Sequence, residues 1–482
     1  MITVRLNKPE FEYDIHSLVK AFYPAEEVHV SVEEVRQEDE ASEMRLDVRY
    51  GIDDIAFAFR ESGKEIRSGV SVDFADRKET KNHLKRALYR LLSEYTGQEL
   101  PWGNLTGIRP TKIPMNLLEE GKSDEEIARY MKDTYYASDE KIDLSIRIAK
   151  RELELLHKLD YENGYSLYIG IPFCPSTCLY CSFTSYPLGV WKERMDDYLT
   201  ALEKEIDFTA VKFAHKKLNT IYIGGGTPTT LTAGQLDRLI RKIKCSFDLS
   251  ELVEFTVEAG RPDSITRDKL QVLRNHDVSR ISINPQTMKQ ETLDLIGRHH
   301  TVEQTVESFY LARELGFDNI NMDLIVGLPD EGIDDVENTM ERLRELDPDS
   351  ITVHSLAIKR AARLRMFKED YQNYKIVNTK EHIDLTAKAA GEMGLSPYYL
   401  YRQKNMAGNF ENVGYARPGK AGVYNVLIME EKQTIVACGA GSISKRVYPD
   451  GRIERCENVK DVASFIERID EMIERKRKLF EG

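Results

Sequence analysis

The sequence has 482 residues, of which 41% are apolar and 31% charged, and its 68 basic and 81 acidic side chains give a net charge of −13. This length exceeds what one hydrophobic core organises, so two or three domains are expected, and the composition excludes a disordered chain. The acidic balance argues against a nucleic-acid partner. No run of eighteen apolar residues and no signal peptide pattern occurs, which predicts a cytoplasmic protein without a membrane span.

The first part of the chain predicts a small α+β domain over residues 1–97. Alternating segments, MRLDVRY and DIAFAF, occur together with helical stretches, HSLVKAFY and a run from Glu79 to Tyr95. A turn-rich segment follows, and Ser138 with two acidic residues after it predicts a helix that runs to about Leu159. Residues 98–160 are therefore expected to form a linker and a helical segment.

Strand-then-helix repeats over residues 161–360 predict a parallel sheet. The expected strands are SLYIGI, TIYIGG, LVEFTVE, SRISIN, NINMDLI and SITVHSL, with amphipathic helices between them. Such repeats form an α/β fold with right-handed crossovers, either a doubly wound sheet or a partial barrel, because six units cannot complete an eight-stranded barrel. The Tyr-rich remainder, 361–482, is expected to be a mainly helical and loop region that caps the open side.

Three of the six cysteines, Cys174, Cys178 and Cys181, fall within eight residues just after the first of these strands. Iron–sulfur clusters are held by thiolates, and three ligands leave one iron with an open position. A zinc site would need a fourth ligand, and no other Cys or His lies within fifteen residues. A chance grouping conflicts with the proline and polar residues between the cysteines. The spacing therefore predicts an iron–sulfur cluster that leaves one iron open for chemistry.

Polar residues and glycines at the ends of the later strands indicate a ligand site beside these cysteines. Gly224, Gly225 and Gly226 follow the second strand, where glycine lets a ligand approach the backbone, although a tight turn explains them equally well. Glu258 ends the third strand, where it could accept hydrogen bonds from ribose hydroxyls or be a surface charge. Asp323 lies inside an otherwise apolar strand, and a buried carboxylate is costly unless it is paired, so we expect it to be functional.

Three motifs carry a resemblance to a known family: Y-x-G-I-P-F-C around Tyr168 to Cys174, G-G-G-T-P at 224–228, and N-I-N-M-D-L-I-V-G-L-P at 319–329. Over roughly residues 165 to 450 the chain resembles the radical S-adenosylmethionine (SAM) superfamily, and within it the oxygen-independent coproporphyrinogen III oxidase family, in its HemZ-like branch. The resemblance implies a partial (β/α)6 radical SAM barrel, a 4Fe-4S cluster on the three cysteines, and one or two molecules of SAM.

The resemblance also assigns roles to single residues. It implies that Gly225, Gly226, Thr227 and Glu258 hold SAM, and that Tyr168, Tyr180 and Ile443 belong to the same first SAM site. A second SAM site would take Gln286, Arg298, Asp323 and Ala357. Tyr168 and Asp323 are the catalytic candidates. His354, in the sixth strand, is expected to be structural.

The activity that the resemblance implies is oxidative decarboxylation of coproporphyrinogen III propionates to vinyl groups, which gives protoporphyrinogen IX in anaerobic haem biosynthesis. A reduced flavodoxin- or ferredoxin-type protein would donate electrons. The substrate is a polyanion, so Arg261, Arg360 and Arg363, near strand ends, are candidates for a basic rim.

Two departures from the family pattern leave alternatives open. Phe183 stands where the well-studied oxidases carry a fourth cysteine, and Gly170 stands where they carry a histidine. The alternatives are a haem-binding or trafficking protein without oxidase activity, and a radical SAM enzyme that acts on another tetrapyrrole or on RNA. The related haem chaperones carry H-N-x-x-Y-W where residues 411–416 lack both the His and the Trp, which favours the oxidase.

Overall fold

The structure, a computed structural model, describes residues 1–32, 44–107, 109–183, 185–357, 374–403 and 410–481. The chain forms two compact units, Met1–Lys150 with Arg402–Phe410 and Arg151–Tyr401 with Glu411–Gly482. The finer division into four segments, with boundaries at 97, 160 and 360, stays a prediction.

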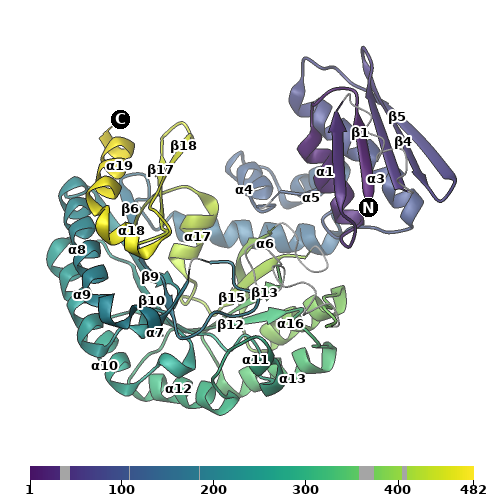
Figure 1. The fold of residues 1–482 in the computed structure, drawn as a ribbon. Helices are drawn as coiled ribbons and strands as arrows, with labels where there is room; N and C mark the ends of the chain where they lie inside the picture. Colours follow the sequence, from purple (N-terminus) through teal and green to yellow (C-terminus); the bar gives the residue numbers. More distant parts are fainter. Residues whose placement is uncertain (33–43, 108, 184, 358–373, 404–409, 482) are drawn as a thin grey trace. The chain divides into compact units, whose positions relative to one another are not determined.

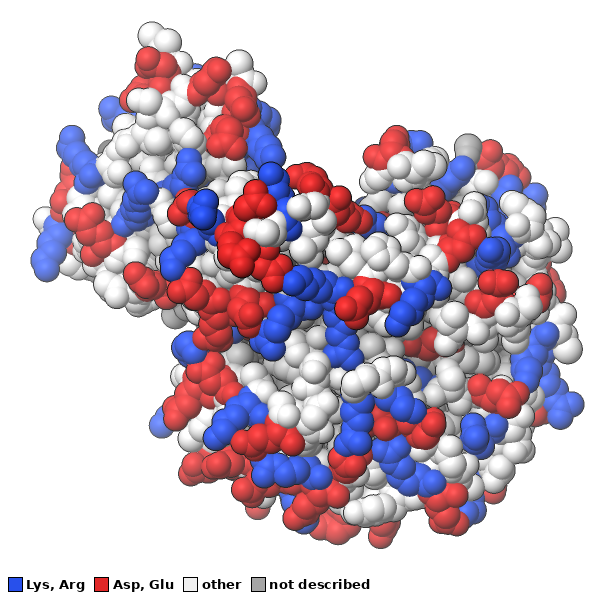
Figure 2. Space-filling view, turned by 180° about the vertical axis from the view of Figure 1, so that it is seen from behind, with Lys and Arg blue, Asp and Glu red and all other residues white. Residues whose placement is uncertain are grey.

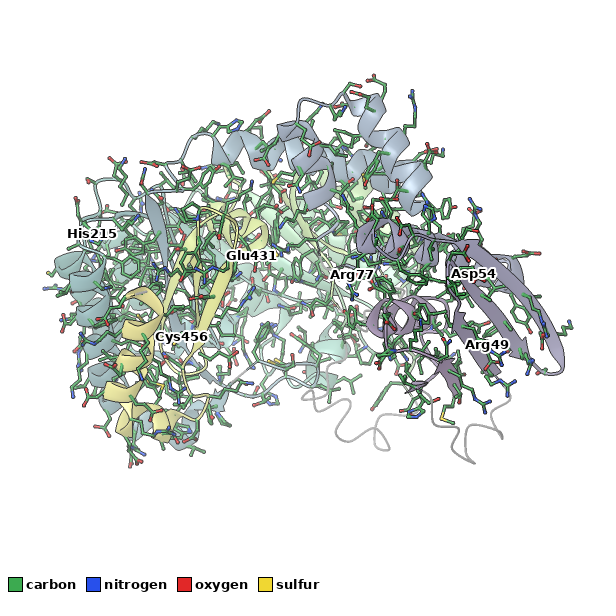
Figure 3. The ribbon with its side chains drawn as sticks, turned by 90° about the horizontal axis from the view of Figure 1, so that it is seen from above. Arg49, Asp54, Arg77, His215, Glu431 and Cys456 are labelled. Carbon is green, nitrogen blue, oxygen red and sulfur yellow. The ribbon has the colours of Figure 1, made fainter. Side chains whose placement is uncertain are left out.

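The first unit begins with a five-stranded sheet in the order β2-β1-β3-β4-β5, drawn in purple in Figure 1. β1 is parallel to β2 and β3, and β3, β4 and β5 form an antiparallel meander. Alternate strand residues, such as Val4, Leu46 and Phe57, are buried in one core with residues of α1 and α3. Asp54 and Arg49, labelled in Figure 3, are exposed on this unit. The bounds are β1 Ile2–Leu6, α1 Glu12–Phe22, β2 Val28–Val32, β3 Met44–Tyr50, β4 Asp54–Glu61, β5 Lys64–Ser71 and α3 Arg77–Thr96.

Local capping sets the helix boundaries that follow. The Asp76 carboxylate accepts hydrogen bonds from the first N–H groups of α3, and Gly97 ends this helix in the left-handed conformation (φ 66°). Ser138 caps the predicted next helix, because its hydroxyl accepts from Lys141 N at 3.3 Å. The helices after α3 are α4 Lys112–Glu119, α5 Asp124–Tyr135 and α6 Asp139–Leu156.

The second unit is built on an 11-stranded sheet in the order β14-β15-β13-β12-β11-β10-β9-β6-β16-β17-β18. Its centre consists of the six predicted strands, which pair in parallel and in chain order. Because the strand order ends at β14 and β18 without closing, the sheet is an open, partial barrel, which is one of the two folds that six repeats allow and the one that the family resemblance implies. The six strands are β6 Gly164–Ile171, β9 Lys217–Gly225, β10 Glu254–Gly260, β11 Arg280–Ile283, β12 Ile320–Val326 and β13 Ser350–Ser355.

Helices cover the outer side of this curved sheet (Figure 1). Capping boxes define the start of two of them, because Thr232 pairs with Gln235 before α9 and Thr301 pairs with Gln304 before α12. The connecting elements are β7 Phe173–Cys174, β8 Tyr186–Pro187, α7 Leu188–Trp191, α8 Met195–Lys212, α9 Ala233–Ser246, α10 Arg267–Asn275, α11 Gln290–Leu295, α12 Val302–Glu314 and α13 Ile333–Leu346.

The C-terminal region contains more strand than the expected helical and loop cap. β14 and β15 add to one edge of the sheet in antiparallel pairing, and β16 adds to the other edge in parallel with β6. These strands have five or six residues each, too few for periodicity to separate strand from helix. The bounds are α16 Lys380–Glu392, β14 Ser396–Tyr401, β15 Asn412–Ala416, α17 Val423–Glu430, β16 Thr434–Cys438, β17 Ile443–Val447, β18 Ile453–Glu457, α18 Val462–Glu467 and α19 Ile469–Glu481.

Candidate functional site

The inner face of the parallel strands is polar along its length, whereas the face under the helices is apolar. Tyr168 pairs in register with Tyr222, Glu258 with Ser282, and Asp323 with Thr352. The residues between them are buried and apolar, and include Ile169, Ile223, Val257, Ile281 and Met322. Parallel strands packed on both sides normally read as continuous apolar runs. The alternation of polar and apolar residues along these strands therefore indicates that the inner face binds a polar ligand.

The three cysteines lie in one loop at the carboxyl end of β6. Cys174 is in β7, and the loop turns back at Cys181, whose N–H donates to the Cys178 carbonyl at 3.1 Å. All three thiols are free and half-buried. Leu179 N donates to Ile296 O at 2.9 Å, which attaches the loop to the segment after α11. The loop thus presents three unpaired sulfurs at the end of the sheet where α/β folds hold their ligands.

Burial keeps the Cys174 thiol protonated unless a bound metal centre displaces its proton. Burial raises the pKa of the Cys174 thiol to about 11, the other two cysteines add to the rise, and the hydrogen bond from Thr227 opposes it. Ionisation of all three thiols would require positive charge among them, as a bound metal centre supplies. Among the described residues no three His, Cys, Asp or Glu side chains converge as the ligands of a single ion would. The donor set fits an iron–sulfur cluster, whose ligands are spread over several irons.

Gly224 to Gly226 bring the end of β9 against the cysteine loop. Gly226 N donates to Ile171 O at 2.8 Å and Thr227 N to Phe173 O at 2.7 Å. A Cβ on Gly226 would lie 2.6 Å from the Phe173 carbonyl oxygen, and Gly225 has φ +111°. Glycine is therefore required here for close backbone contact. The Thr227 hydroxyl lies 3.6 Å from Cys174 Sγ.

Glu258 is held inside the barrel by a tyrosine. Tyr222 donates to Glu258 Oε1 at 2.5 Å, and a Cβ on Gly224 would lie 2.9 Å from the Glu258 carboxyl carbon. Burial raises the pKa of Glu258 to about 7; the Asp323 carboxylate adds to the rise, while Tyr222 and Arg280 oppose it. Tyr168, Tyr222 and Tyr424 stack beside this carboxylate, with Tyr222 and Tyr424 centroids 4.5 Å apart. Glu258 is an acceptor that titrates near neutral pH.

Asp323 has the opposite electrostatic setting. Asn321 Nδ2 donates to its Oδ1 at 2.7 Å, and His354 Nε2 lies 3.8 Å from its Oδ2. Burial opposes ionisation, but the His354 imidazole nearby and hydrogen bonds from Asn321 and Thr352 outweigh burial and keep the pKa of Asp323 below its ordinary value. His354, expected to be only structural, is thus a partner of the candidate carboxylate.

Gln286 and Arg298 lie in the connection after β11. Gln286 has φ +70°, and its backbone pairs with β12 through Gln286 N to Asp323 O and Ile325 N to Gln286 O, both at 2.9 Å. Strained positions of this kind cluster at functional sites. Arg298, 3% exposed, donates to Tyr180 Oη at 3.3 Å and to Asn284 O at 2.9 Å. These two residues link Asp323 on β12 to Tyr180 in the cysteine loop.

Several residues of this inner face were missed in the sequence. Ser282 Oγ and Asn284 Oδ1 are buried and have no hydrogen-bond partner among the described residues, as expected for atoms that meet a ligand. Tyr222, Tyr424 and His354 also belong to the face. The alternation of polar and apolar residues in RISIN and TIYIG could have identified Ser282, Asn284 and Tyr222, whereas no local pattern marks Tyr424.

The remaining candidates lie at the margin of this group. Ala357, half-buried, follows β13, and Ile443 begins β17 with 44% exposure. The turn before Ile443 packs on the strand that leads to the cysteines, because Tyr198 Oη donates to Gly170 O at 2.6 Å and accepts from Ala440 N at 3.1 Å.

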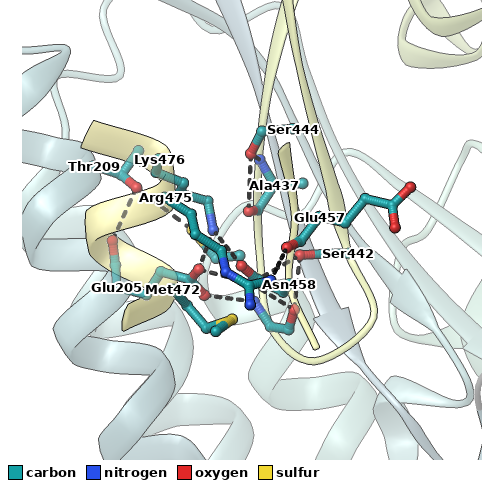
Figure 4. A network of polar contacts seen from close by, with 12 residues as sticks. Glu205, Thr209, Ala437, Ser442, Ser444, Glu457, Asn458, Met472, Arg475 and Lys476 are labelled. Atoms are coloured by element: carbon teal, nitrogen blue, oxygen red, sulfur yellow. Dashed lines mark hydrogen bonds and ion pairs between the residues drawn. The ribbon is translucent and has the colours of Figure 1, made fainter. Parts of the chain in front are cut away.

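A buried polar network holds this turn, as Figure 4 shows. Glu205 of α8 accepts from Gly439 N and from Asn458 Nδ2, both at 2.7 Å, and forms an ion pair with Lys476 of α19. Glu205 and Lys476 are 0% and 1% exposed. Three C-terminal segments far apart in the sequence, at Gly439, Asn458 and Lys476, are therefore bound to helix α8, which connects the first two strands of the barrel.

The three other cysteines lie outside this group of residues. Cys438 is buried in β16, and Cys456 is half-buried in β18 (Figure 3). Cys245 is exposed in the last turn of α9. Burial raises the pKa of Cys438 to about 12.

The prediction that Arg261 belongs to a basic rim is wrong. Arg261 is 4% exposed and ion-paired with Asp263 at 2.7 Å, so it does not form a solvent-facing rim. Arg360 and Arg363 lie outside the described residues. On the face in Figure 2, Lys and Arg side chains are interspersed with Asp and Glu. No helix in the described part of the chain is long and apolar enough to cross a bilayer.

Comparison with known proteins identifies the class of protein first. The Radical SAM superfamily profile matches residues 168–343, which include the cysteine loop and the strands that carry Glu258 and Asp323. The solved structure of coproporphyrinogen III oxidase (HemN) from Escherichia coli, a radical SAM enzyme, covers 64% of this chain and 70% of its own, with a TM-score of 0.53 and 24% identity. The second unit therefore has the radical SAM fold, and the superfamily implies a 4Fe-4S cluster and SAM.

The particular family follows from closer relatives. HemZ of Bacillus subtilis (strain 168), an oxygen-independent coproporphyrinogen-III oxidase-like protein, is 43% identical over 412 residues, which are 84% of this chain and 82% of HemZ. The heme chaperone HemW of the same organism is 41% identical over 198 residues, 40% of this chain and 51% of HemW. The chain belongs to the HemZ-like branch of the oxygen-independent coproporphyrinogen III oxidase family.

Proposed function

We propose that this protein decarboxylates the propionate side chains of coproporphyrinogen III to vinyl groups, giving protoporphyrinogen IX. The observation that carries the proposal is that three thiols and the Gly225–Thr227 segment meet at the carboxyl ends of β6 and β9, and that Glu258 and Asp323 lie on neighbouring strands of the same sheet. The extended similarity to HemZ, and 34% identity to the Escherichia coli oxidase over 41% of this chain, supports this substrate class.

The residues of the site divide the work as follows. Cys174, Cys178 and Cys181 would hold the cluster, and Gly225, Gly226, Thr227 and Glu258 would hold SAM beside it. When bound, the cluster and SAM supply a 5′-deoxyadenosyl radical that removes a hydrogen atom from the substrate. Asp323, Gln286 and Arg298 would provide further charged and hydrogen-bonding groups for the bound molecules. To become a vinyl group, each propionate would lose one hydrogen atom to the radical, one electron to an external acceptor, and carbon dioxide.

The tyrosines and apolar residues shield this face from water. Tyr168, Tyr222 and Tyr424 form a continuous aromatic stack across β6, β9 and α17. These rings would exclude water from a ligand held beside them. In this proposal Tyr168 orients the bound cofactor, and Asp323, ionised at neutral pH, accepts hydrogen bonds from it or from the substrate.

A haem chaperone is the competing function, since HemW shares the radical SAM core. The stretch that resembles the chaperone motif does not favour it. Asn412 is buried in β15 and its Oδ1 accepts from Ser355 N at 2.7 Å, so this side chain serves the sheet. Residues 411–416 also lack the histidine and tryptophan of that motif.

An anaerobic assay separates the two functions. The protein, reconstituted with iron and sulfide and supplied with SAM and a chemical reductant, is incubated with coproporphyrinogen III. We expect release of carbon dioxide and formation of protoporphyrinogen IX. The products are oxidised to the fluorescent porphyrins and measured by chromatography. Cys178→Ala serves as the matched control without an intact cluster. Cleavage of SAM without decarboxylation would refute the oxidase, and stoichiometric haem binding in that case would support the chaperone.

A further inference from the structure

Arg261 occupies a buried position directly beside the cysteine loop. It follows β10 after Gly260, which has φ +67°, and only 4% of its surface is exposed. Its Nε donates to Asp263 Oδ1 at 3.0 Å and its Nη2 to Asp263 Oδ2 at 2.7 Å. This two-point contact with one carboxylate fixes the plane and direction of the guanidinium group.

The third nitrogen of the same guanidinium reaches the loop. Arg261 Nη1 donates to Ser176 Oγ at 2.7 Å and to Ser176 O at 3.1 Å, and lies 4.0 Å from Cys178 Sγ. Ser176 stands between Cys174 and Cys178, and its hydroxyl donates in turn to Gly297 O at 2.7 Å. One guanidinium therefore connects the carboxyl end of β10, the loop between two cysteines, and the segment after α11.

A structural role alone does not account for the placement of this charge. The main-chain carbonyl and hydroxyl of Ser176 could be satisfied by a neutral donor, yet the chain buries a full positive charge within reach of a cysteine sulfur. Burying a charge is costly unless it is paired. Asp263 offsets that cost, but its side chain is 19% exposed whereas that of Arg261 is 5% exposed, so water screens the carboxylate more than the cation.

We propose that Arg261 positions the cysteine loop and raises the reduction potential of the cluster that the loop would hold. The inference rests on the proposed function in so far as these three cysteines hold that cluster. Reduction adds one negative charge to a cluster, and a fixed, poorly screened cation stabilises the reduced form more than the oxidised form. Hydrogen bonds to ligand sulfurs and local net charge are the factors that set iron–sulfur potentials.

Three variants separate the charge from the loop contact. Arg261→Gln removes the charge but keeps an amide that can donate to Ser176, and should give a more negative midpoint potential. Arg261→Lys keeps the charge without the two-point contact to Asp263, and should stay closer to the original protein. Asp263→Asn removes the opposing charge and should shift the potential in the positive direction. Arg267→Gln is the charge-matched control, because it removes an exposed arginine at the start of α10 that is paired with Glu314.

The measurement is an anaerobic redox titration of the reconstituted protein, followed by the electron paramagnetic resonance signal of the reduced cluster, without any tetrapyrrole. A more negative potential in Arg261→Gln with a shift of opposite sign in Asp263→Asn would support the inference. Equal potentials in Arg261→Gln and the original protein, or an equal shift in Arg267→Gln, would overturn it. If Arg261→Gln assembles no cluster, the sign of the Asp263→Asn shift decides.

The same titration keeps this inference distinct from the proposed function. A cluster in the original protein with unchanged potentials in the variants overturns the role of Arg261 and leaves the proposed function intact. Absence of any reducible cluster in the original protein overturns both. Failure to decarboxylate coproporphyrinogen with the predicted potential shifts present overturns only the substrate.

Discussion

Two carboxylates on the inner face of the barrel are tuned in opposite directions by their neighbours. Burial raises the pKa of Glu258 to about 7. The His354 imidazole nearby and hydrogen bonds from Asn321 and Thr352 keep the pKa of Asp323 below its ordinary value, against the effect of burial. Carboxylates whose environments separate their pKa values commonly have separate chemical roles. At neutral pH, Asp323 is charged and Glu258 is partly protonated.

The pKa of Glu258 predicts a pH dependence of SAM binding. Above pH 7 the carboxylate is charged and accepts strong hydrogen bonds from ribose hydroxyls, and below pH 7 it is protonated and accepts weaker ones. We expect SAM to bind about fivefold more tightly at pH 8 than at pH 6, the difference between a charge-assisted and a neutral hydrogen bond of about 1 kcal/mol. Isothermal titration calorimetry on the cluster-loaded protein measures this. Glu258→Gln should show little of the effect, and an equal slope in that variant would refute the assignment.

At the scale of elements, the end of β9 is fitted to the cysteine loop through glycine. Gly226 leaves no room for a side chain because the obstacle is the Phe173 carbonyl, which is main chain and cannot rotate away. The contact therefore couples the position of the loop to that of the Gly224–Thr227 segment.

Gly226→Ala should weaken SAM binding by about tenfold, because overpacking of this kind costs about 1–3 kcal/mol and here displaces the loop that precedes Cys174. Calorimetry and the iron content after reconstitution are the measurements. Gly234→Ala is the control, since a Cβ there meets nothing within 4 Å and lies in the first turn of α9. Equal SAM affinity in the two variants would show that the close contact between Gly226 and Phe173 does not affect SAM binding.

The ion pair between Glu205 and Lys476 joins α8 to α19 in a fully buried position. Lys476→Met would leave the Glu205 carboxylate buried without its cation, and breaking such a pair costs about 3–5 kcal/mol of unfolding free energy. Urea unfolding followed by circular dichroism measures this loss. The double variant Glu205→Gln with Lys476→Met should recover a large part of it, because no charge remains unpaired.

An exposed lysine provides the comparison for that experiment. Lys388 lies 3.8 Å from Glu392 on α16 with 80% of its side chain exposed, and Lys388→Met should leave the unfolding midpoint nearly unchanged. A double variant as unstable as Lys476→Met alone would mean that shape, and not unpaired charge, is responsible for the loss.

For the molecule as a whole, the buried carboxylate of Glu152 links pH to stability. Glu152 of α6 is 0% exposed and neither of its carboxylate oxygens has a hydrogen-bond partner among the described residues. Burial, and then the nearby carboxylate of Glu430 at the end of α17, raise the pKa of Glu152 well above its ordinary value. Ionising this group in the folded protein is therefore unfavourable.

The sign of the resulting pH dependence follows from the direction of this shift. In the unfolded chain Glu152 ionises near pH 4.5, while the folded protein keeps the proton to higher pH, so stability falls as pH rises above about 4.5. A single titrating group changes the free energy of unfolding by at most about 1.4 kcal/mol per pH unit. Glu152→Gln should flatten this slope. Its melting temperature should therefore fall less between pH 5 and pH 8 than that of the original protein. Parallel stability curves for the variant and the original protein would contradict the prediction.

The sequence by itself determined the six parallel strands and the cysteine loop, whereas the choice between a doubly wound sheet and an open barrel came from the family resemblance. Alternating strand and helix patterns are local, and the cysteine spacing lies within one loop, so neither depends on distant residues. Asp323 was also visible in the sequence, because a carboxylate inside an apolar strand must have a partner.

Only the tertiary structure decided which residues those local features meet. His354 belongs to a different strand from Asp323, Tyr424 comes from a helix nearly 170 positions after Glu258 in the sequence, and Arg261 proves to face Ser176 and Cys178 and not a solvent-facing rim. The strands β14 to β18 are likewise too short to be recognised by periodicity and are stabilised by pairing with the sheet edges. Side-chain partners and edge strands depend on contacts between residues far apart in the chain, and a local pattern carries no information about them.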